Sequence, residues 1–289
     1  MNYRHHFHAG NFADVMKHAL LVQLVRALQR KEKGFLFLDT HAGRGSYDLT
    51  LAARGDSLER KPEWPEGIGR LWGEDLPAGP LDDYVTVVRQ FDHDRGNRDA
   101  LPRYYPGSPQ IAKQLARPQD RLAFCEMHPE EEAALADELR YAPHAIVQLI
   151  DGYTGVKALL PPAERRALVL IDPPFEDQDE FERIAAAVRD GIARLAGAVV
   201  AVWYPLTERA RVDAFFTELQ RHRLPPTLAA ELTVAGELSP LKMRGCGLVV
   251  VNPPWQFDGV AENLLQDMAV RLAQQPGASA RVDWIVPEV

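Results

Sequence analysis

The residues of this chain best suited to chemistry are Asp172, Pro173, Pro174 and Phe175, which follow the apolar run 168–171. Such a run predicts a buried strand, and the prolines end it because they cannot donate ladder hydrogen bonds. The turn gathers a carboxylate, the Pro173 carbonyl and an aromatic ring. A planar aromatic amine needs these groups, since it offers two N–H donors and a face for stacking. The motif also fits a stiff turn with Asp172 as a solvated cap, and alone it leaves both interpretations open.

Three further acids, Asp39, Glu126 and Asp151, each end another predicted strand. Ligands of open α/β sheets bind outside the carboxyl ends of the strands. We therefore expect these acids to receive hydroxyl and amine donors from a ligand. Glu126 is placed to accept the two ribose hydroxyls of an adenosine cofactor.

The glycine turn after the first strand, Gly43-Arg44-Gly45-Ser46, discriminates between cofactors. It lacks the third glycine of GxGxxG, which serves close helix packing beside a pyrophosphate. Glu126 also lies far beyond the roughly 20-residue spacing of that motif. An adenosine cofactor without phosphates needs only a close backbone approach, so we favour S-adenosylmethionine.

Strands that alternate with helices predict an α/β fold with a doubly wound parallel sheet. Residues 47–103 carry broken helical patterns and no convincing strand. We therefore expect a Rossmann-like domain of residues 1–46 and 104–289 with a small helical subdomain inserted at 47–103. Ser108 and Pro109 have the N-cap and N1 residue types of the helix that follows the insertion. The closely spaced strands at 229–234 and 248–251 predict an antiparallel hairpin at the sheet edge.

The chain has 289 residues and a formal net charge of −8, which argues against a uniformly basic surface that coats nucleic acid. Residues 1–33 carry six Lys or Arg against two acids, so this segment offers the most basic face. No apolar stretch reaches the roughly 18 residues of a membrane span. The amino terminus also lacks a signal peptide's apolar region. We expect a cytoplasmic monomer.

The histidines and cysteines do not indicate a metal site. His5, His6 and His8 have no acidic or cysteine partner at ligand spacing, so we expect no metal. Cys125 and Cys246 are far apart and flanked by apolar residues, which predicts buried thiols.

Two other motifs have a structural and a functional interpretation. Asn252-Pro253-Pro254-Trp255 also follows an apolar strand and resembles an amine-binding motif. We favour Asp172 because its strand lies beside the glycine turn in the predicted order. The run from Tyr3 to Asn11 fits a solvated arm, but interleaved aromatic and basic residues also attract unpaired bases and phosphates.

Taken together, these motifs resemble the bacterial large-subunit ribosomal RNA adenine-N6 methyltransferase family, RlmJ type. The resemblance covers essentially the whole chain and rests on these segments: Tyr3-Arg4-His5, residues 10–18, Leu38-Asp39-Thr40-His41-Ala42-Gly43, Tyr105-Pro106-Gly107-Ser108-Pro109, Asp151-Gly152 and Asp172-Pro173-Pro174-Phe175.

The resemblance implies a class I S-adenosylmethionine-dependent methyltransferase fold and a 23S ribosomal RNA substrate, with adenine 2030 as the family's target. It implies that Asp172 handles the amine proton and that Tyr3 contacts the RNA. The implied cofactor residues are His18, His41, Ser108, Glu126, Asp151 and Gly152. Phe175 stands where many amino-methyltransferases carry Tyr, which keeps the stacking and loses a phenolic hydroxyl.

Two alternatives to this function remain at the level of sequence. A DNA adenine-N6 methyltransferase would share the same strand-end chemistry. A non-catalytic RNA-binding protein on the same fold would have no use for both the cofactor acids and the Asp172 motif.

Overall fold

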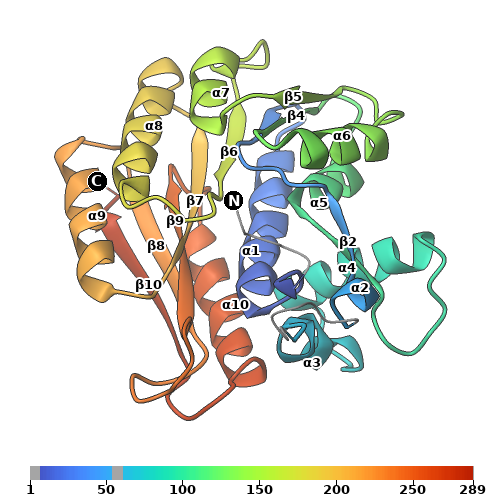
Figure 1. The fold of residues 1–289 in the computed structure, drawn as a ribbon. Helices are drawn as coiled ribbons and strands as arrows, with labels where there is room; N and C mark the ends of the chain where they lie inside the picture. Colours follow the sequence, from blue (N-terminus) through green and yellow to red (C-terminus); the bar gives the residue numbers. More distant parts are fainter. Residues whose placement is uncertain (1–6, 54–60, 289) are drawn as a thin grey trace.

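The computed structural model describes residues 7–53 and 61–288. One large sheet runs through the molecule in the order β10-β8-β9-β7-β6-β1-β4-β5 (Figure 1). Its parallel part comprises β1 (Leu36–Asp39), β4 (Arg121–Glu126), β5 (Ala145–Leu149), β6 (Ala167–Ile171) and β7 (Val199–Pro205). From β1 the chain builds β4 and β5 on one side and then crosses to β6 on the other. The strand order therefore reverses between β1 and β6.

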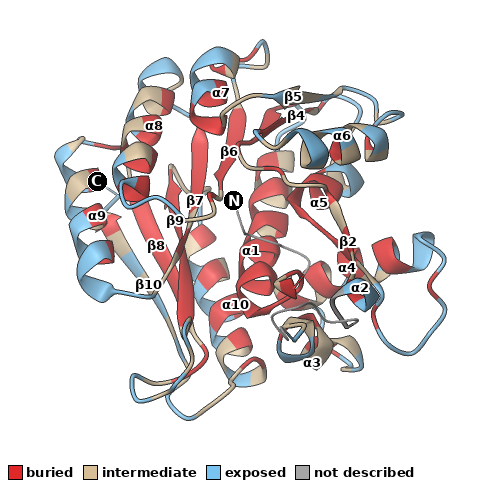
Figure 2. Cartoon of the chain, in the orientation of Figure 1, coloured by how far each residue is buried: buried red, intermediate tan, exposed pale blue. Residues whose placement is uncertain are grey.

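Helices cover both faces of this sheet, as a doubly wound fold requires. One face packs against α1 (Phe12–Gln29), α5 (Ser108–Leu115), α6 (Pro129–Glu138) and α10 (Phe257–Arg271). The other packs against α7 (Gly152–Leu159), α8 (Glu180–Arg194) and α9 (Arg209–Arg221). Neighbouring residues of β6 alternate between the two cores, and Figure 2 shows the central strands buried.

Helix α1 is buried along nearly its whole length, and its buried residues include the charged Asp14 and Lys17. The Asn11 side chain caps it by accepting hydrogen bonds from the backbone N–H groups of Ala13 and Asp14. A helix that is buried on all sides must satisfy its polar side chains inside the protein. Lys17 and His18 are therefore expected to have internal partners.

The described part of the segment between β2 (Ser46–Asp48) and β3 (Tyr104–Pro106) contains three short helices and one of 15 residues. They are α2 (Leu49–Ala53), η2 (Trp64–Glu66), α3 (Ile68–Trp72) and α4 (Pro80–Asp94). β2 and β3 pair with each other, which corrects the expectation that residues 47–103 contain no strand. Apolar side chains of α3 and α4 share one core with α1, so the insertion packs directly on the helix layer.

The far side of the sheet differs from the prediction of an edge hairpin. β8 (Thr227–Thr233) and β9 (Gly245–Val251) do pair antiparallel, but β9 lies between β7 and β8. The edge strand is β10 (Ser279–Val286), which pairs antiparallel with β8. The strand of residues 279–286, α7 and α10 were not anticipated from the sequence.

Both cysteines are buried free thiols, as predicted. Over the described residues, no helix has the length and apolar character needed to span a membrane. In the same part of the chain, no group of three or more His, Cys, Asp or Glu side chains is arranged to hold a metal ion.

Candidate active site

The carboxyl ends of the parallel strands open into a cavity of about 1550 Å³ at the point where the strand order reverses. The predicted site residues among the described residues all line it: His18, His41, Ser108, Glu126, Asp151, Gly152, Asp172, Pro173 and Phe175. Tyr3 lies outside the described residues. A cavity at a topological switch point is where this fold class binds its ligands.

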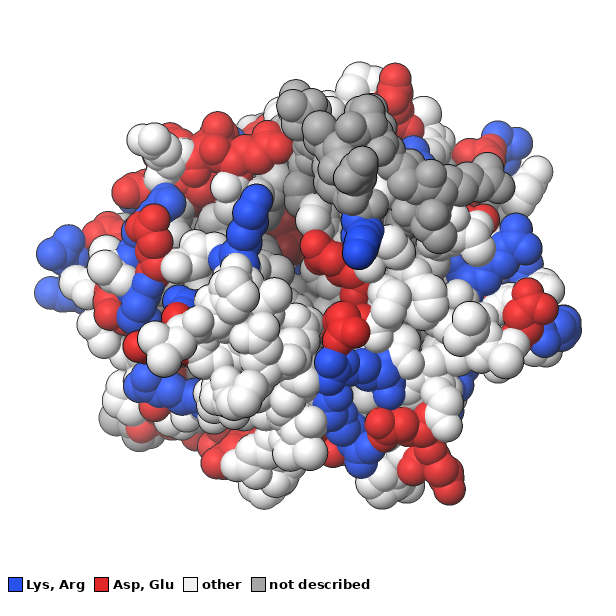
Figure 3. All heavy atoms as spheres, turned by 60° about the horizontal axis from the view of Figure 1, so that its bottom comes forward, with Lys and Arg blue, Asp and Glu red and all other residues white. Residues whose placement is uncertain are grey.

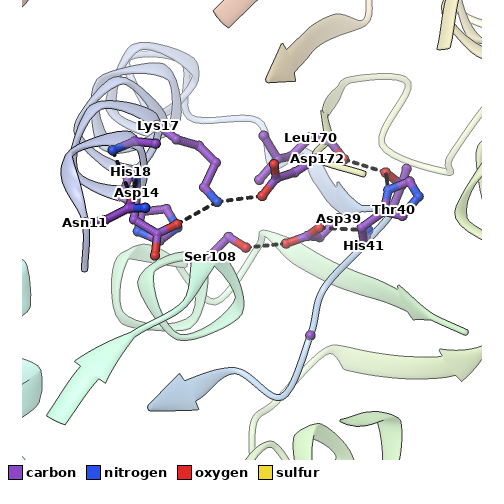
Figure 4. Close-up of polar contacts among 12 residues, drawn as sticks. Asn11, Asp14, Lys17, His18, Asp39, Thr40, His41, Ser108, Leu170 and Asp172 are labelled. Carbon is purple, nitrogen blue, oxygen red and sulfur yellow. Dashed lines mark hydrogen bonds and ion pairs between the residues drawn. The ribbon is translucent and has the colours of Figure 1, made fainter. Parts of the chain in front are cut away.

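Asp172 follows β6 and is held by a lysine from α1. Its Oδ2 atom lies 2.5 Å from the Lys17 Nζ atom, which also contacts Asp14 Oδ1 at 2.9 Å (Figure 4). The Lys17 side chain is 7% exposed and that of Asp172 is 18% exposed. Burial opposes the charge on Lys17, but the two carboxylates outweigh it and hold the pKa of Lys17 well above its usual value. Lys17 therefore stays charged and fixes Asp172 at the cavity wall.

Lys17 and Asp14 are site residues that no sequence motif predicted. Lys17 and Asp172 are 155 positions apart, and no local pattern links them. A usable signal was present, because two charged residues three positions apart lie in a helix whose other residues are largely apolar. Such residues need buried partners of opposite charge.

Phe175 contributes an aromatic wall next to Asp172. Its ring meets Phe181 and Trp203 edge-on, with centroids 5.1 Å and 5.8 Å away. Its backbone has φ of 52°, a left-handed conformation that is unfavourable for a bulky residue and persists only where the surroundings enforce it. The turn after the prolines therefore holds the ring in a fixed position beside the cavity.

Glu126 is fixed by backbone N–H groups. Its Oε2 atom accepts from Gly43 N at 2.8 Å, and Oε1 accepts from the N–H groups of Met127 and His128, each at 2.8 Å. Gly43 itself has φ of 60°, which glycine adopts without strain. The carboxylate therefore joins the glycine turn to the end of β4.

Asp151 and Gly152 begin α7 beside the turn after β1. The Asp151 side chain accepts from Thr154 N at 2.9 Å and lies 3.3 Å from Arg183. A Cβ atom on Gly152 would lie 2.0 Å from the Thr40 carbonyl oxygen. Only glycine permits this approach of two backbone segments.

Ser108 and Asp39 depart from the sequence-based expectations. Gly107, not Ser108, is the N-cap of α5, and the Ser108 hydroxyl instead donates to Asp39 Oδ2 at 2.7 Å. Asp39 is fully buried and does not line the cavity, so the expectation that it receives ligand donors is wrong. Burial raises the pKa of Asp39 to about 7, with nearby Asp172 adding to the effect and Ser108 opposing it.

Hydrogen-bond partners define the tautomer of His18. The Tyr84 hydroxyl lies 2.9 Å from the Tyr105 hydroxyl, which lies 2.8 Å from His18 Nδ1. Within the described ranges Tyr84 has no other hydrogen-bond partner, and a buried donor left unpaired is costly. Tyr84 therefore donates to Tyr105, and Tyr105 donates to Nδ1. His18 carries its proton on Nε2.

His41 is held by Thr40. The Thr40 hydroxyl oxygen lies 2.7 Å from His41 Nδ1 and 3.0 Å from the Leu170 carbonyl oxygen. Burial lowers the pKa of His41 to about 4, so the ring is neutral at neutral pH. Both histidines line the same cavity.

The second Pro-Pro motif lies at the opposite end of the central strands. Asn252 directly follows β9, which runs antiparallel to β7. Its side-chain amide donates to the carbonyls of Ala196 and Ala198, each at 2.8 Å, just before β7. These bonds explain the residue structurally, and the choice of Asp172 over this motif agrees with the geometry.

The strand order, the helices on both faces and the cavity at the switch point define a Rossmann-like methyltransferase of class I. Comparison with known proteins is more specific. Residues 32–286 match the family model described as ribosomal RNA large subunit methyltransferase D, RlmJ. The chain belongs to this ribosomal RNA large subunit methyltransferase family.

Full-length relatives have the same extent. The ribosomal RNA large subunit methyltransferase J proteins of Escherichia coli and Haemophilus influenzae are each 38% identical to this chain, over 288 and 289 residues and 100% of both chains. A crystal structure of a Legionella pneumophila protein is 34% identical. It covers 96% of this chain and 98% of its own, with a TM-score of 0.84.

Proposed function

We propose that this protein transfers a methyl group from S-adenosylmethionine to the N6 amine of an adenine in 23S ribosomal RNA, adenine 2030 in the family's numbering. The observation that carries the proposal is the placement of Asp172. Its carboxylate is partly exposed in the cavity beside the glycine turn, next to Pro173 and the Phe175 ring.

The cavity fits S-adenosylmethionine at its β1–β4–β5 side. Glu126 would accept the ribose hydroxyls, since its carboxylate is already oriented by backbone donors. The Nε2–H group of His18 suits a carboxylate, and the neutral His41 ring lines the same side. Asp151, Gly152 and Ser108 line the same side. When bound, this cofactor supplies an electrophilic methyl group on a sulfonium.

Asp172 and Pro173 would hold the adenine amine. Lys17 occupies Oδ2 of Asp172, and no donor from the described residues contacts Oδ1, which leaves that oxygen for an amine N–H. The Pro173 carbonyl would accept the second N–H while Phe175 supports the ring. Holding both N–H groups directs the nitrogen lone pair toward the methyl donor, and such placement is a large part of catalysis in two-substrate reactions.

Asp172 also stabilises the positive charge that develops on the amine during methyl transfer. The amine becomes cationic as the bond to the methyl forms, and a carboxylate within hydrogen-bond distance stabilises that charge. The proton then leaves from the Asp172 side of the nitrogen. Lys17 acts as a positioning residue in this account, because it orients Asp172 without needing to contact the base.

The substrate adenine must be unpaired or flipped, which costs a few kcal/mol in a duplex and less in a loop. We propose that Tyr3 contacts this RNA. We propose an active monomer with residues 47–103 as an inserted subdomain. A ribosomal RNA substrate would place the activity in the cytoplasm.

The test is incubation of the wild-type protein with labelled S-adenosylmethionine and ribosomal RNA from cells that lack it, followed by mapping of the modified nucleotide. N6-methyladenine at one position of 23S RNA is expected. Greater incorporation into duplex DNA would favour the DNA methyltransferase alternative. Absence of cofactor binding by calorimetry would favour a non-catalytic RNA-binding protein.

A further inference from the structure

The cations that line the cavity fall into two groups. Lys17, Arg44 and Arg183 are each held by carboxylates: Lys17 by Asp14 and Asp172, Arg44 by Glu131, and Arg183 by Asp151 and Asp177. Lys61 and Lys242 are exposed and have no ion pair or hydrogen bond to any side chain that the structure describes. These two lysines are therefore available to a ligand's negative charge.

Lys61 and Lys242 come from two different segments that line the same cavity as Asp172. Lys61 belongs to the insertion, next to Glu63, which binds the Asn11 side chain at the start of α1. Lys242 belongs to the loop between β8 and β9, whose neighbours Leu241 and Met243 line the cavity with Trp203. Trp203 in turn contacts Phe175. The cavity that contains the candidate base site is thus lined by one lysine from each of these two segments.

Acidic residues also line the cavity. Those that follow β4, β5 and β6 are Glu126, Glu130, Glu131, Asp151, Asp177 and Glu180, and two more, Glu63 and Glu66, lie near Lys61 and contact Asn11 and Arg70. A phosphodiester backbone is repelled by these carboxylates and attracted to the two lysines that no described carboxylate pairs.

The described residues on the face of the molecule that Figure 3 shows form no broad basic surface. Figure 3 shows Lys and Arg side chains interspersed with Asp and Glu. In the described part of residues 1–33, Lys17 is buried in the site and Arg26 is paired with Asp83. The exposed Arg30, Lys31 and Lys33 follow the end of α1.

We infer that Lys61 and Lys242 bind RNA phosphates on either side of the target adenosine, so that the strand crosses the cavity mouth from the insertion to the β8–β9 loop. The inference rests on the proposed function. It assigns the insertion a role in holding the substrate, and it accounts for an acidic protein that binds RNA through a local contact.

The experiment measures methylation of in vitro transcribed 23S RNA by Lys61→Gln and Lys242→Gln at several KCl concentrations. Each variant is expected to raise the RNA KM by roughly 3- to 10-fold near physiological salt and to reduce the slope of log KM against log salt by about 0.7–0.9. The turnover number and the calorimetric Kd for S-adenosylmethionine should stay unchanged. Lys242→Arg, which keeps the charge, should restore the KM.

The matched control is Lys33→Gln. Lys33 is an exposed lysine just before β1, at the end of that strand that lies away from the cavity. It should leave the KM and the salt slope unchanged. An unaltered salt slope in both Lys61→Gln and Lys242→Gln, or an equal effect of Lys33→Gln, would overturn the inference while leaving the proposed function in place. No methylation of RNA by the wild-type protein would instead refute the proposed function.

Discussion

The raised pKa of the buried Asp39 carboxyl predicts how the free energy of unfolding depends on pH. Its folded-state pKa of about 7 lies above the usual value of 3.8. In the folded protein it therefore holds a proton that the unfolded chain releases at lower pH. Stability from this group is fully present below the unfolded pKa and is lost as pH rises through the folded pKa.

The magnitude follows from the shift. About 3 pKa units at 1.36 kcal/mol each give a loss of about 4 kcal/mol, of which about 3 kcal/mol falls between pH 5 and pH 8. Asp39→Asn removes the titration while keeping a polar group that can bond Ser108. The variant should therefore gain about 3 kcal/mol relative to wild type over this pH range.

The assay is denaturant unfolding of both proteins at several pH values, with the free energy of unfolding of wild type subtracted from that of the variant. The subtraction cancels other groups that titrate alike in both proteins. A difference that stays constant from pH 5 to pH 8 would show that Asp39 is ionised in the folded state at low pH, and would refute the reasoning.

Two further predictions each remove hydrogen bonds, one beside the cavity and one at the second Pro-Pro motif. Tyr105→Phe removes the donor to His18 Nδ1. It should weaken S-adenosylmethionine binding by about 1 kcal/mol, which is roughly a 5-fold higher Kd by calorimetry. The His18 tautomer should also change in ¹⁵N NMR. An unchanged Kd would exclude the hydroxyl from cofactor binding. Asn252→Ala removes the bonds to Ala196 and Ala198. It should cost about 1–3 kcal/mol of unfolding free energy and leave the turnover number intact, whereas lost turnover in a folded variant would implicate the second Pro-Pro motif.

Local sequence signals were sufficient for the parallel half of the sheet. The apolar runs that end in Asp39, Glu126 and Asp172 form strands β1, β4 and β6. The same signal did not reveal what each acid does. Glu126 and Asp172 line the cavity, but Asp39 is enclosed and bonded to Ser108, because burial depends on packing that a strand-end pattern does not encode.

Features set by distant segments were not predictable in this way. The edge strand β10 pairs with β8 across about 50 positions, and its exposed, mixed composition is unlike a buried strand. The contact between Lys17 and Asp172 depends on how α1 packs over the sheet. Ser108 has an N-cap residue type, but its hydroxyl bonds to Asp39 rather than to its own helix.

The central claim is that Asp172 holds the adenine amine at the methyl donor, and single-turnover methyl transfer by Asp172→Asn tests it most directly. RNA and S-adenosylmethionine are supplied at saturating concentrations, and cofactor binding is measured in parallel by calorimetry. We predict a transfer rate at least about 100-fold below wild type with an unchanged cofactor Kd. A near wild-type rate in a variant that binds the cofactor normally would contradict the account.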